Sequence, residues 1–363
     1  MGPSSPVPAY PLEPMSLDNA RIAELLALRA EELSGDRQRA YRRASRAAYK
    51  WPEEASEIAV EGRPLTELTG IGAKLSGLIH SWLDEPPEVP EPPPTREGFV
   101  TFARARTVIA QTAAPPVVRG DLQMHTTFSD GRASIEEMAR AGAALGYDYI
   151  SITDHSQGLK IAGGMDEDEL AEQRREIDRV NEALATDGVA IEVLKSIEMN
   201  LNPQGAGDMD PAALGRLDLV LGSFHSALRK KEDQTTRYVA ALRNPDIHVL
   251  GHPRGRIYNF RLGLTADWPK VFAVAAQEGK ALEIDGFPDR QDLNEELLRI
   301  ARDAGTFISL GTDAHNEQEM TYMAVGVAAA VEAGIERERI LNLLSADELR
   351  AWAADPERRR AAR

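Results

Sequence analysis

From residue 121 onward, the chain alternates between short apolar segments with strand character and longer segments with helical periodicity. The strand-like segments cover residues 121–125, 147–153, 190–198, 217–223, 248–251, 280–284 and 306–311. Helices are predicted between most of them, over residues 134–145, 168–186, 234–242, 268–278 and 294–304. Apolar strands that are separated by helices form buried parallel sheets. The seven repeats therefore predict an α/β fold whose sheet closes, or nearly closes, into a barrel.

Side chains of the kinds that bind metals follow these strands at their carboxyl ends. In the first strand, Gln123 and His125 project to the same face, and the turn at residues 129–131 returns Asp130 towards it. The corresponding residues after the later strands are Asp154, His155, Glu198, His225, His252, Asp313 and His315. Of the seven histidines, only His80 and His248 lie elsewhere. Each residue alone could be structural, but their joint placement on the catalytic rim of a βα barrel predicts a multinuclear metal site.

The chemistry of such a site is limited by the absence of cysteine, which leaves imidazole and carboxylate ligands. These ligands suit Zn²⁺, Mn²⁺ or Fe²⁺, and a carboxylate can bridge two ions. Clustered divalent ions hold phosphate oxygens and lower the pKa of bound water, as phosphoester hydrolysis requires. Arg256, shortly after His252, is predicted to contact the phosphate, with an exposed loop position as the alternative. Asp154 is the second residue to which we assign a catalytic role.

The region before residue 86 has a different character. A helix is predicted over residues 37–49, with a basic stripe on one side. The stripe consists of Arg39, Arg42, Arg43 and Arg46. Further along, Gly70 and Gly72 permit a tight turn that points backbone N–H groups at a phosphate, and Lys74 could contact the same phosphate. A solvated charged face would also explain the stripe, but the two features together predict contacts with the DNA backbone.

Proline-rich stretches mark the boundaries between these parts. The predicted order is a disordered tail (1–15), a helical domain (16–85), a proline-rich linker (86–95), a connecting helix and loop (96–118), the barrel domain (119–345) and a C-terminal helix or tail (346–363). Residues 96–118 are too few to form the palm and fingers of a polymerase. Polymerase activity is therefore not expected.

Bulk composition restricts the partners only weakly. The net charge of −16 disfavours indiscriminate coating of nucleic acid, but it is compatible with a local basic face or an acidic metal site. No apolar run approaches membrane-spanning length, and the N-terminal residues lack the apolar core of a signal peptide. We therefore expect no membrane contact and a cytoplasmic location. The oligomeric state stays open.

The barrel motifs closely resemble those of the PHP (polymerase and histidinol phosphatase) family of metal-dependent phosphoesterases. The matching segments are residues 121–126 with 129–131, 152–156, 196–198, 223–226, 251–256, 282–285 and 311–315. The resemblance implies a distorted seven-stranded βα barrel that binds up to three divalent ions. The implied ligands are His125, Asp130, His155, Glu198, His225, His252, Asp313 and His315.

Two positions depart from the family pattern. Gln123 stands where the family has the first histidine of its His-x-His motif. Because an amide oxygen is a weaker ligand than imidazole for zinc, one metal could be exchangeable, and manganese is the expected activator. The segment Asp285-Gly286-Phe287 replaces a run that usually contains asparagine, which leaves the substrate contacts there open.

Residues 16–85 resemble the N-terminal helix-hairpin-helix domain of family X DNA polymerases, on the strength of residues 39–44 and 68–72. In that family the domain binds the DNA backbone without reading sequence, and bacterial members join it to a PHP domain with 3'–5' exonuclease and end-cleaning phosphatase activity. The leading hypothesis is therefore a phosphoesterase that processes DNA ends in repair and lacks polymerase activity. The alternatives are a small-molecule phosphatase of the histidinol-phosphate type and a catalytically weak DNA-binding protein.

Overall fold

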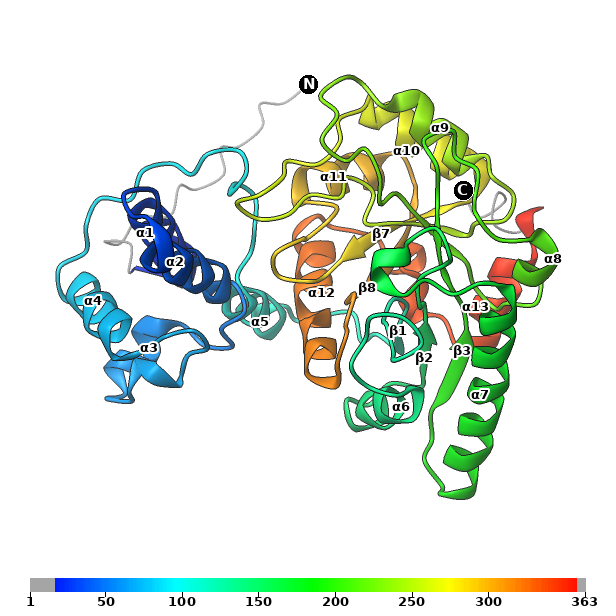
Figure 1. The fold of residues 1–363 in the computed structure, drawn as a ribbon, viewed down its shortest axis with the longest axis horizontal. Coiled ribbons are helices and arrows are strands. Elements are labelled where there is room, and N and C mark those ends of the chain that lie inside the picture. Colours follow the sequence, from blue (N-terminus) through cyan, green and yellow to red (C-terminus); the bar gives the residue numbers. More distant parts are fainter. Residues whose placement is uncertain (1–16, 358–363) are drawn as a thin grey trace, which may run out of the picture. The chain divides into compact units, whose positions relative to one another are not determined.

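The computed structural model describes residues 17–357, and the chain divides after Glu91 into two compact units (Figure 1). The division falls inside the proline-rich segment that was predicted to be a linker. The predicted tail at residues 1–15 lies outside the described residues. None of the helices in residues 17–357 combines the length and the hydropathy that crossing a lipid bilayer requires.

The first unit is helical. Its elements are α1 (Asn19–Glu31), α2 (Gly35–Ala48), α3 (Ala55–Val60), the 3₁₀ turn η1 (Leu65–Glu67) and α4 (Ala73–Asp84). α1 starts at Asp18, whose carboxylate accepts a hydrogen bond of 2.8 Å from Arg21 N. Small residues allow α1 and α2 to approach closely, and Ser45 Oγ of α2 donates to Ala23 O of α1 at 2.8 Å. Both helices therefore share one small core, and the opposite side of α2 stays in solvent.

Between residues 92 and 357, the second unit contains eight short strands that all pair in parallel. They are β1 (Gly120–Asp121), β2 (Tyr149–Ile152), β3 (Glu192–Lys195), β4 (Glu198–Asn200), β5 (Leu221–Ser223), β6 (Val249–Gly251), β7 (Ala281–Asp285) and β8 (Phe307–Gly311). The strand orders are β1-β2-β3 and β4-β5-β6-β7-β8. β3 and β4 correspond to the single predicted strand 190–198, interrupted at Ser196 and Ile197.

Hydrogen bonds beyond the regular strands close the two sheets into a barrel. Leu122 N donates to Leu310 O at 3.3 Å, and His125 N donates to Ala314 O at 2.8 Å, which joins β1 to β8. A parallel bridge between His155 and Glu198 joins the β2 side to β4. The α/β barrel predicted from the sequence is therefore confirmed, with its closure made at the ends of the strands.

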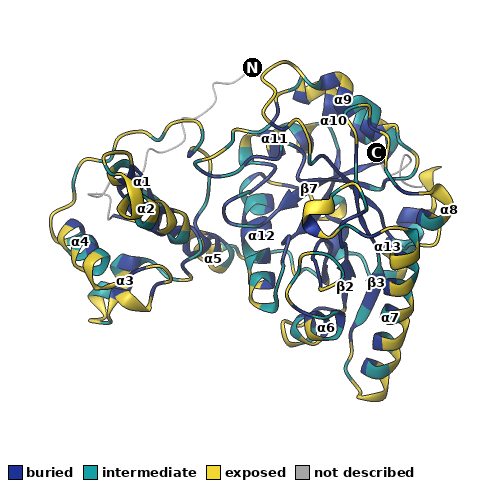
Figure 2. Ribbon diagram, in the orientation of Figure 1, coloured by how far each residue is buried: buried dark blue, intermediate teal, exposed yellow. Residues whose placement is uncertain are grey.

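Helices cover the outside of this barrel, as Figure 1 shows for α6 and α7. The helices of the second unit are α5 (Phe102–Gln111), α6 (Ile135–Ala144), α7 (Glu167–Thr186), α8 (Pro211–Leu214), α9 (Thr235–Leu242), α10 (Trp268–Glu278), α11 (Glu295–Asp303), α12 (Met323–Glu332) and α13 (Ala346–Ala354). Short 3₁₀ turns lie at Lys160–Ala162, Glu317–Tyr322, Arg337–Arg339 and Leu341–Leu343. Figure 2 shows that the central strands are buried and that the outer faces of helices such as α7 are exposed.

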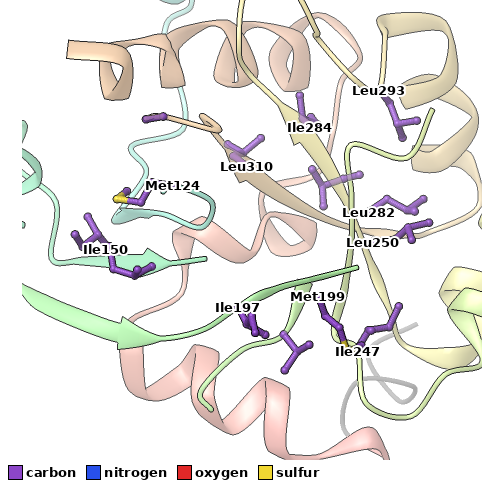
Figure 3. Close-up of a cluster of buried hydrophobic side chains, with 14 of the residues drawn as sticks. Met124, Ile150, Ile197, Met199, Ile247, Leu250, Leu282, Ile284, Leu293 and Leu310 are labelled. Atoms are coloured by element: carbon purple, nitrogen blue, oxygen red, sulfur yellow. The ribbon is translucent and has the colours of Figure 1, made fainter. Parts of the chain in front are cut away.

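The inside of the barrel is layered. At the end opposite to the loops that follow the strands, Leu122, Leu194 and Val249 form an apolar cluster with Trp352 of α13, which closes this end. Outward-facing residues such as Ile150, Leu282 and Leu310 belong to the large cluster drawn in Figure 3. Inward-facing positions nearer the rim are polar, so the apolar layers hold the polar residues in fixed positions.

The connection into the barrel differs from the expectation of one helix from residue 96. α5 starts at Phe102, after Thr101, whose hydroxyl accepts a hydrogen bond of 3.2 Å from Arg104 N. Gly98 has a φ of 66°, which interrupts a helix. Residues 94–100, which we call the strap, consist of a turn and a bend without regular secondary structure, and they bond to other parts of the second unit. Val100 N, for example, donates to Gln291 Oε1 at 2.7 Å.

Candidate metal centre

Seven of the eight predicted ligands come from the segments that follow the strands, Glu198 is the first residue of β4, and the structure brings all eight together. Glu198 lies at the centre and is fully buried. His252 Nε2 and His225 Nε2 lie 2.6 Å and 3.3 Å from its Oε1 atom. His155 Nδ1 and His125 Nε2 lie 3.0 Å and 3.5 Å from its Oε2 atom. One carboxylate therefore faces four imidazoles, which is the arrangement expected of a bridging ligand.

The remaining ligands complete the cluster on either side of His125. Its Nε2 atom lies 2.9 Å from Asp313 Oδ1, and its Nδ1 atom lies 4.0 Å from Asp130 Oδ1. Asp130 Oδ1 is also 3.5 Å from His155 Nε2 and 3.4 Å from His315 Nε2. Three groups have donor atoms within 4.8 Å of one another: His125, Asp130, His155 and His315; His155, Glu198 and His225; and His125, Glu198 and Asp313.

The donor atoms fit divalent cations in spacing and in chemistry. Two ligands of a tetrahedral ion at about 2.0–2.1 Å lie roughly 3.3–3.4 Å apart, close to most of these separations. The Nδ1 atoms of His125 and His252 are buried and make no hydrogen bond, a costly state for a polar atom without a ligand. His252 and Asp313 also adopt left-handed backbone conformations, with φ values of 22° and 51°. Such strain in residues other than glycine is typical of functional sites.

The electrostatics of the cluster favour ionised carboxylates. Burial alone would raise the pKa of Glu198, but the neighbouring His155, His225 and His252 outweigh it and hold this pKa well below its ordinary value. In Asp130 the hydrogen bond from His315 likewise overcomes the effect of burial and lowers the pKa. The same pairing raises the pKa of His315 to about 9 against the effect of its burial. The lowered pKa values of Glu198 and Asp130 favour their charged forms, which are the forms that bind cations.

Beneath this layer lies a second buried acid, Glu283 of β7. Its Oε2 atom accepts a hydrogen bond of 2.7 Å from His252 N. The side-chain amide of Gln123 faces the same carboxyl group, and the orientation that turns its nitrogen towards Glu283 places that nitrogen 2.8 Å from Oε2 and 2.5 Å from Oε1. Burial and the nearby charge of Asp285 raise the pKa of Glu283 well above its ordinary value. In this orientation Gln123 bonds to Glu283 through its nitrogen, and its carbonyl oxygen is left for the predicted metal contact.

Asp154 has a different environment from the one that a catalytic role requires. Its carboxylate is fully buried and accepts hydrogen bonds from Thr126 N at 2.7 Å, Ser129 Oγ at 2.5 Å and Gln173 Nε2 at 2.7 Å. Thr126 Oγ1 is a fourth donor, at 2.6 Å. With its oxygens used in this way, Asp154 orders the loop that carries Asp130. We assign it a positioning role in place of the predicted catalytic one.

Arg256 also differs from its prediction. Its guanidinium donates to the carbonyl oxygens of Glu97 and Gly98 in the strap, at 3.3 Å and 2.9 Å. It also lies 3.7 Å from the centroid of the Phe99 ring. Only 5% of the residue is exposed. Because its guanidinium is bonded to the strap, Arg256 anchors the strap and is not positioned to bind a substrate phosphate.

The cation that does reach the cluster is Arg290, which the sequence analysis missed. Its Nε atom lies 3.2 Å from Asp313 Oδ2 and 3.9 Å from Asp285 Oδ2, and about a third of its side chain is exposed. Burial alone would lower the pKa of Arg290, but Asp313 and Asp285 raise it above its ordinary value. The available signal was its position in the loop after β7, on the same rim as the ligands.

In the first unit, the predicted DNA-contacting elements are neighbours. Arg39, Arg42, Arg43 and Arg46 of α2, Gly70, Gly72 and Lys74 are all exposed. Gly70 has a φ of 83°, and a Cβ atom there would lie 3.3 Å from the Cβ atom of Ala47 in α2. The glycine turn therefore packs directly against the helix that carries the basic stripe. α4 begins immediately after this turn, with Gly72 at its N-cap.

Comparison with known proteins identifies the class. The family model described as the PHP domain matches residues 121–312, more than half of the chain. The chain therefore belongs to the PHP family, and its barrel carries the metal centre of a phosphoester hydrolase.

Individual relatives differ in length. A Bacillus subtilis protein, the DNA polymerase/3'-5' exonuclease PolX, is 37% identical over 236 residues, which cover 65% of this chain and 41% of the relative. The chain thus spans about two fifths of that protein. A probable phosphatase of Thermoanaerobacter is 28% identical over 235 residues, which cover 61% of this chain and 89% of the relative. The structure of Lactococcus lactis histidinol phosphate phosphatase matches with a TM-score of 0.44 and 17% identity, over 61% of this chain and 95% of the other.

Proposed function

We propose that this protein is a metal-dependent phosphoesterase that acts on DNA ends, as a 3'–5' exonuclease, a 3'-phosphatase or both, and that it has no polymerase activity. The observation that carries the hydrolytic part is the convergence of four imidazoles on Glu198, with Asp130 and Asp313 beside them. When bound there, divalent ions would hold the phosphate oxygens and supply a hydroxide nucleophile.

The residues of the chain divide the remaining work. His125, Asp130, His155, Glu198, His225, His252, Asp313 and His315 are the proposed ligands. Arg290 is placed beside Asp313, where its guanidinium can bind a non-bridging phosphate oxygen and stabilise the charge that develops on it. Asp154 fixes the position of the Asp130 loop. Gln123 is proposed as a weak ligand through its carbonyl oxygen, so one ion would exchange readily, and manganese is the expected activator.

Two observations favour DNA as the substrate. The basic stripe of α2 lies against the glycine turn that precedes α4, which together offer cations and outward backbone N–H groups to phosphates. The Bacillus subtilis relative bears the name of a DNA polymerase and 3'-5' exonuclease. Between the two parts, residues 92–118 form only the strap, α5 and loops, which supports the absence of a polymerase active site.

The test compares substrates directly. Purified protein is incubated with Mn²⁺ and end-labelled DNA that carries a 3'-hydroxyl or a 3'-phosphate, and in parallel with histidinol phosphate. We expect DNA to be the better substrate and chelation to abolish hydrolysis. His155→Ala and Asp313→Ala should abolish it as well. Preference for histidinol phosphate would instead support the small-molecule phosphatase, and retained DNA binding without hydrolysis would support the catalytically weak binding protein.

DNA binding by the first unit has its own test. Replacing Arg42, Arg43 and Lys74 by glutamate should remove the salt-dependent DNA affinity of the full chain, because phosphate contacts dominate such binding. Arg29→Glu on α1 is the matched control, since Arg29 is exposed and pairs with Glu32. Equal affinities of the triple variant and the control would refute the proposed interface.

A further inference from the structure

The loop that follows His252 carries an exposed aromatic residue, Phe260, that has no role in the proposed metal centre. Phe260 is 56% exposed, and it is the only aromatic among the large exposed hydrophobic residues found within residues 17–357. A single exposed apolar side chain is common and means little. The setting of this ring is what distinguishes it, because its neighbours in the chain are held by hydrogen bonds, a cation lies over it and its loop follows the metal ligand His252.

The support is the rim hairpin, residues 255–264. Ile257 and Arg261 exchange backbone hydrogen bonds of 2.8 Å and 3.0 Å, and Tyr258 N donates to Asp289 O at 2.8 Å. Asn259 N donates to Thr95 O of the strap at 2.8 Å. Tyr258 is buried, and its ring packs on Phe99 with the centroids 5.3 Å apart. The residues that flank Phe260 are therefore fixed from two sides, while the ring itself stays in solvent.

Cations gather around this ring. The Arg229 guanidinium lies 4.6 Å from the centroid of Phe260, in the cation–π range. Arg229 belongs to the loop after His225 and starts the exposed run Arg229-Lys230-Lys231. Together with its burial, the charges of Arg290 and Arg229 lower the pKa of the Arg261 guanidinium. Arg261 follows Phe260 in the chain, is partly exposed, and donates through Nε to Gly255 O within the hairpin. The positive charges near Phe260 favour an anionic ligand.

This group of cations runs towards the metal centre. Arg290 lies 3.2 Å from Asp313, and Asp289 next to it anchors the rim hairpin. The two loops that carry Arg229 and Phe260 follow His225 and His252, which both lie within 3.3 Å of Glu198. The rim hairpin therefore continues from the metal ligand His252 and is bonded to the loop that carries Arg290, which makes this side of the rim a candidate path for an extended ligand.

We propose that Phe260, Arg229 and Arg261 form a platform for a single-stranded DNA end, in which a base stacks on Phe260 while the arginines bind the adjoining phosphates. An aromatic ring beside cations along a phosphate path is how proteins hold single strands without reading their sequence. The platform rests on the proposed action on DNA and adds to it a second DNA contact, on the catalytic barrel. A small phosphomonoester is too short to use it.

The test isolates the barrel within the full chain. Arg42, Arg43 and Lys74 are replaced by glutamate to remove binding by the first unit, and the affinity for a short single-stranded oligonucleotide is measured with and without Phe260→Ala. We expect Phe260→Ala to weaken binding by about fivefold or more, as loss of one stacked base does. Phe260→Tyr should bind as the parent does. Leu145→Ala, at the exposed C-terminus of α6, is the matched apolar control and should change nothing.

A second measurement does not depend on catalysis. In Phe260→Trp, the fluorescence of the introduced indole should be quenched by the oligonucleotide, beyond any change in the four native tryptophans. Hydrolysis of p-nitrophenyl phosphate should stay within about twofold in Phe260→Ala, because that substrate does not reach the ring. Equal oligonucleotide affinities for the parent and Phe260→Ala would overturn the platform.

The two proposals fail in distinguishable ways. If the wild type binds oligonucleotides through Phe260 but never cleaves them, the proposed hydrolysis of DNA is wrong and the platform stands. If DNA is cleaved with the same KM in the wild type and Phe260→Ala, the platform is wrong and the hydrolytic function stands. Protein association that disappears with Phe260→Ala, combined with unchanged DNA affinity, would assign the ring to a protein partner and overturn the proposal.

Discussion

Two fully buried glutamates, Glu198 and Glu283, lie inside the same barrel, but their pKa values are shifted in opposite directions. Burial disfavours the charged form of both carboxyl groups. Glu198 faces imidazoles, which hold its pKa well below the ordinary value, whereas Glu283 faces Asp285 and its pKa is raised well above it. The barrel thus separates a layer at the rim that favours the charged form of an acid from a layer beneath it that favours the neutral form, and neighbours, more than depth, decide which acid can bind a cation.

The strongest test of this contrast removes the charge from each acid without changing its shape. Glu198→Gln should lower hydrolysis of p-nitrophenyl phosphate by about a thousandfold and reduce the bound metal, because it deletes the negative charge that would hold the cations at the centre of the cluster. Glu283→Gln should stay within about threefold, because burial and the charge of Asp285 already disfavour the charged form of that carboxyl group, and Gln123 can reorient its amide to pair with the new side chain. Activity and metal content per chain are the measurements. A comparable loss in both variants would refute the two-layer description.

A second test asks how far the charged layer extends, by comparing two arginines. Arg290→Ala should lower kcat/KM by about one hundredfold, as the loss of one group that stabilises the transition state does. Arg256→Ala should leave kcat nearly unchanged and lower the free energy of unfolding by about 2–4 kcal/mol, because the strap loses its buried anchor. Steady-state kinetics and urea unfolding separate the two effects. A kcat loss in Arg256→Ala at full stability would restore the catalytic role first predicted for it.

A variant of Asp154 tests whether the charged layer at the rim needs an ordered loop beside it. Asp154→Asn replaces an acceptor of four hydrogen bonds by a group that can accept only part of them, so the Asp130 loop should loosen. We expect metal affinity to fall about tenfold, with kcat recovered at saturating Mn²⁺, as for residues that orient ligands. Metal titration followed by kinetics measures both quantities. A kcat that stays low at saturating metal would instead support direct catalysis by Asp154.

A further test, of stability and not of activity, concerns the pH dependence of folding. Burial raises the pKa of Asp121 to about 7, against hydrogen bonds from Thr312 and Gln123 that lower it. The folded protein therefore keeps this proton between about pH 4 and pH 7 while the unfolded chain loses it, so stability falls as the pH rises through this window. Asp121→Asn should remove that contribution.

The stability difference between Asp121→Asn and the wild type should consequently shift in favour of the variant by up to about 1.4 kcal/mol per pH unit and level off above pH 7. Urea unfolding at several pH values, with equal Mn²⁺ in both proteins, measures this difference. A difference that stays constant between pH 4 and pH 8 would show that Asp121 is ionised throughout, like the acids of the rim.

The barrel and its ligand set were predictable because both depend on local sequence patterns. Each strand is short and apolar, and each ligand follows its strand within a few residues, so periodicity places His155 or His252 on the rim without knowledge of the neighbours. Parallel strands then bring the rim residues together as a consequence of topology. The predicted seven strands differ from the observed eight only because the strand containing Glu198 is interrupted.

The roles of Asp154, Arg256 and Arg290 were not predictable in this way, because each depends on partners far away in sequence. Arg256 donates a hydrogen bond to Gly98 O, 158 residues earlier. Asp154 accepts hydrogen bonds from Thr126, Ser129 and Gln173. No local pattern distinguishes an arginine that points at a strap from one that points at a phosphate. Arg290 becomes informative only once β7 and β8 place it beside Asp313.

By itself, the sequence determined the α/β barrel, the separate helical unit and the identity of the residues gathered at the rim, since hydrophobic periodicity and turn chemistry act over short distances. Only the tertiary structure decided which buried acids are charged, which arginine is free to meet a substrate and where an aromatic ring is left in solvent. Electrostatic energies and hydrogen-bond saturation depend on distances between side chains from different strands, and those distances exist only after the barrel has closed.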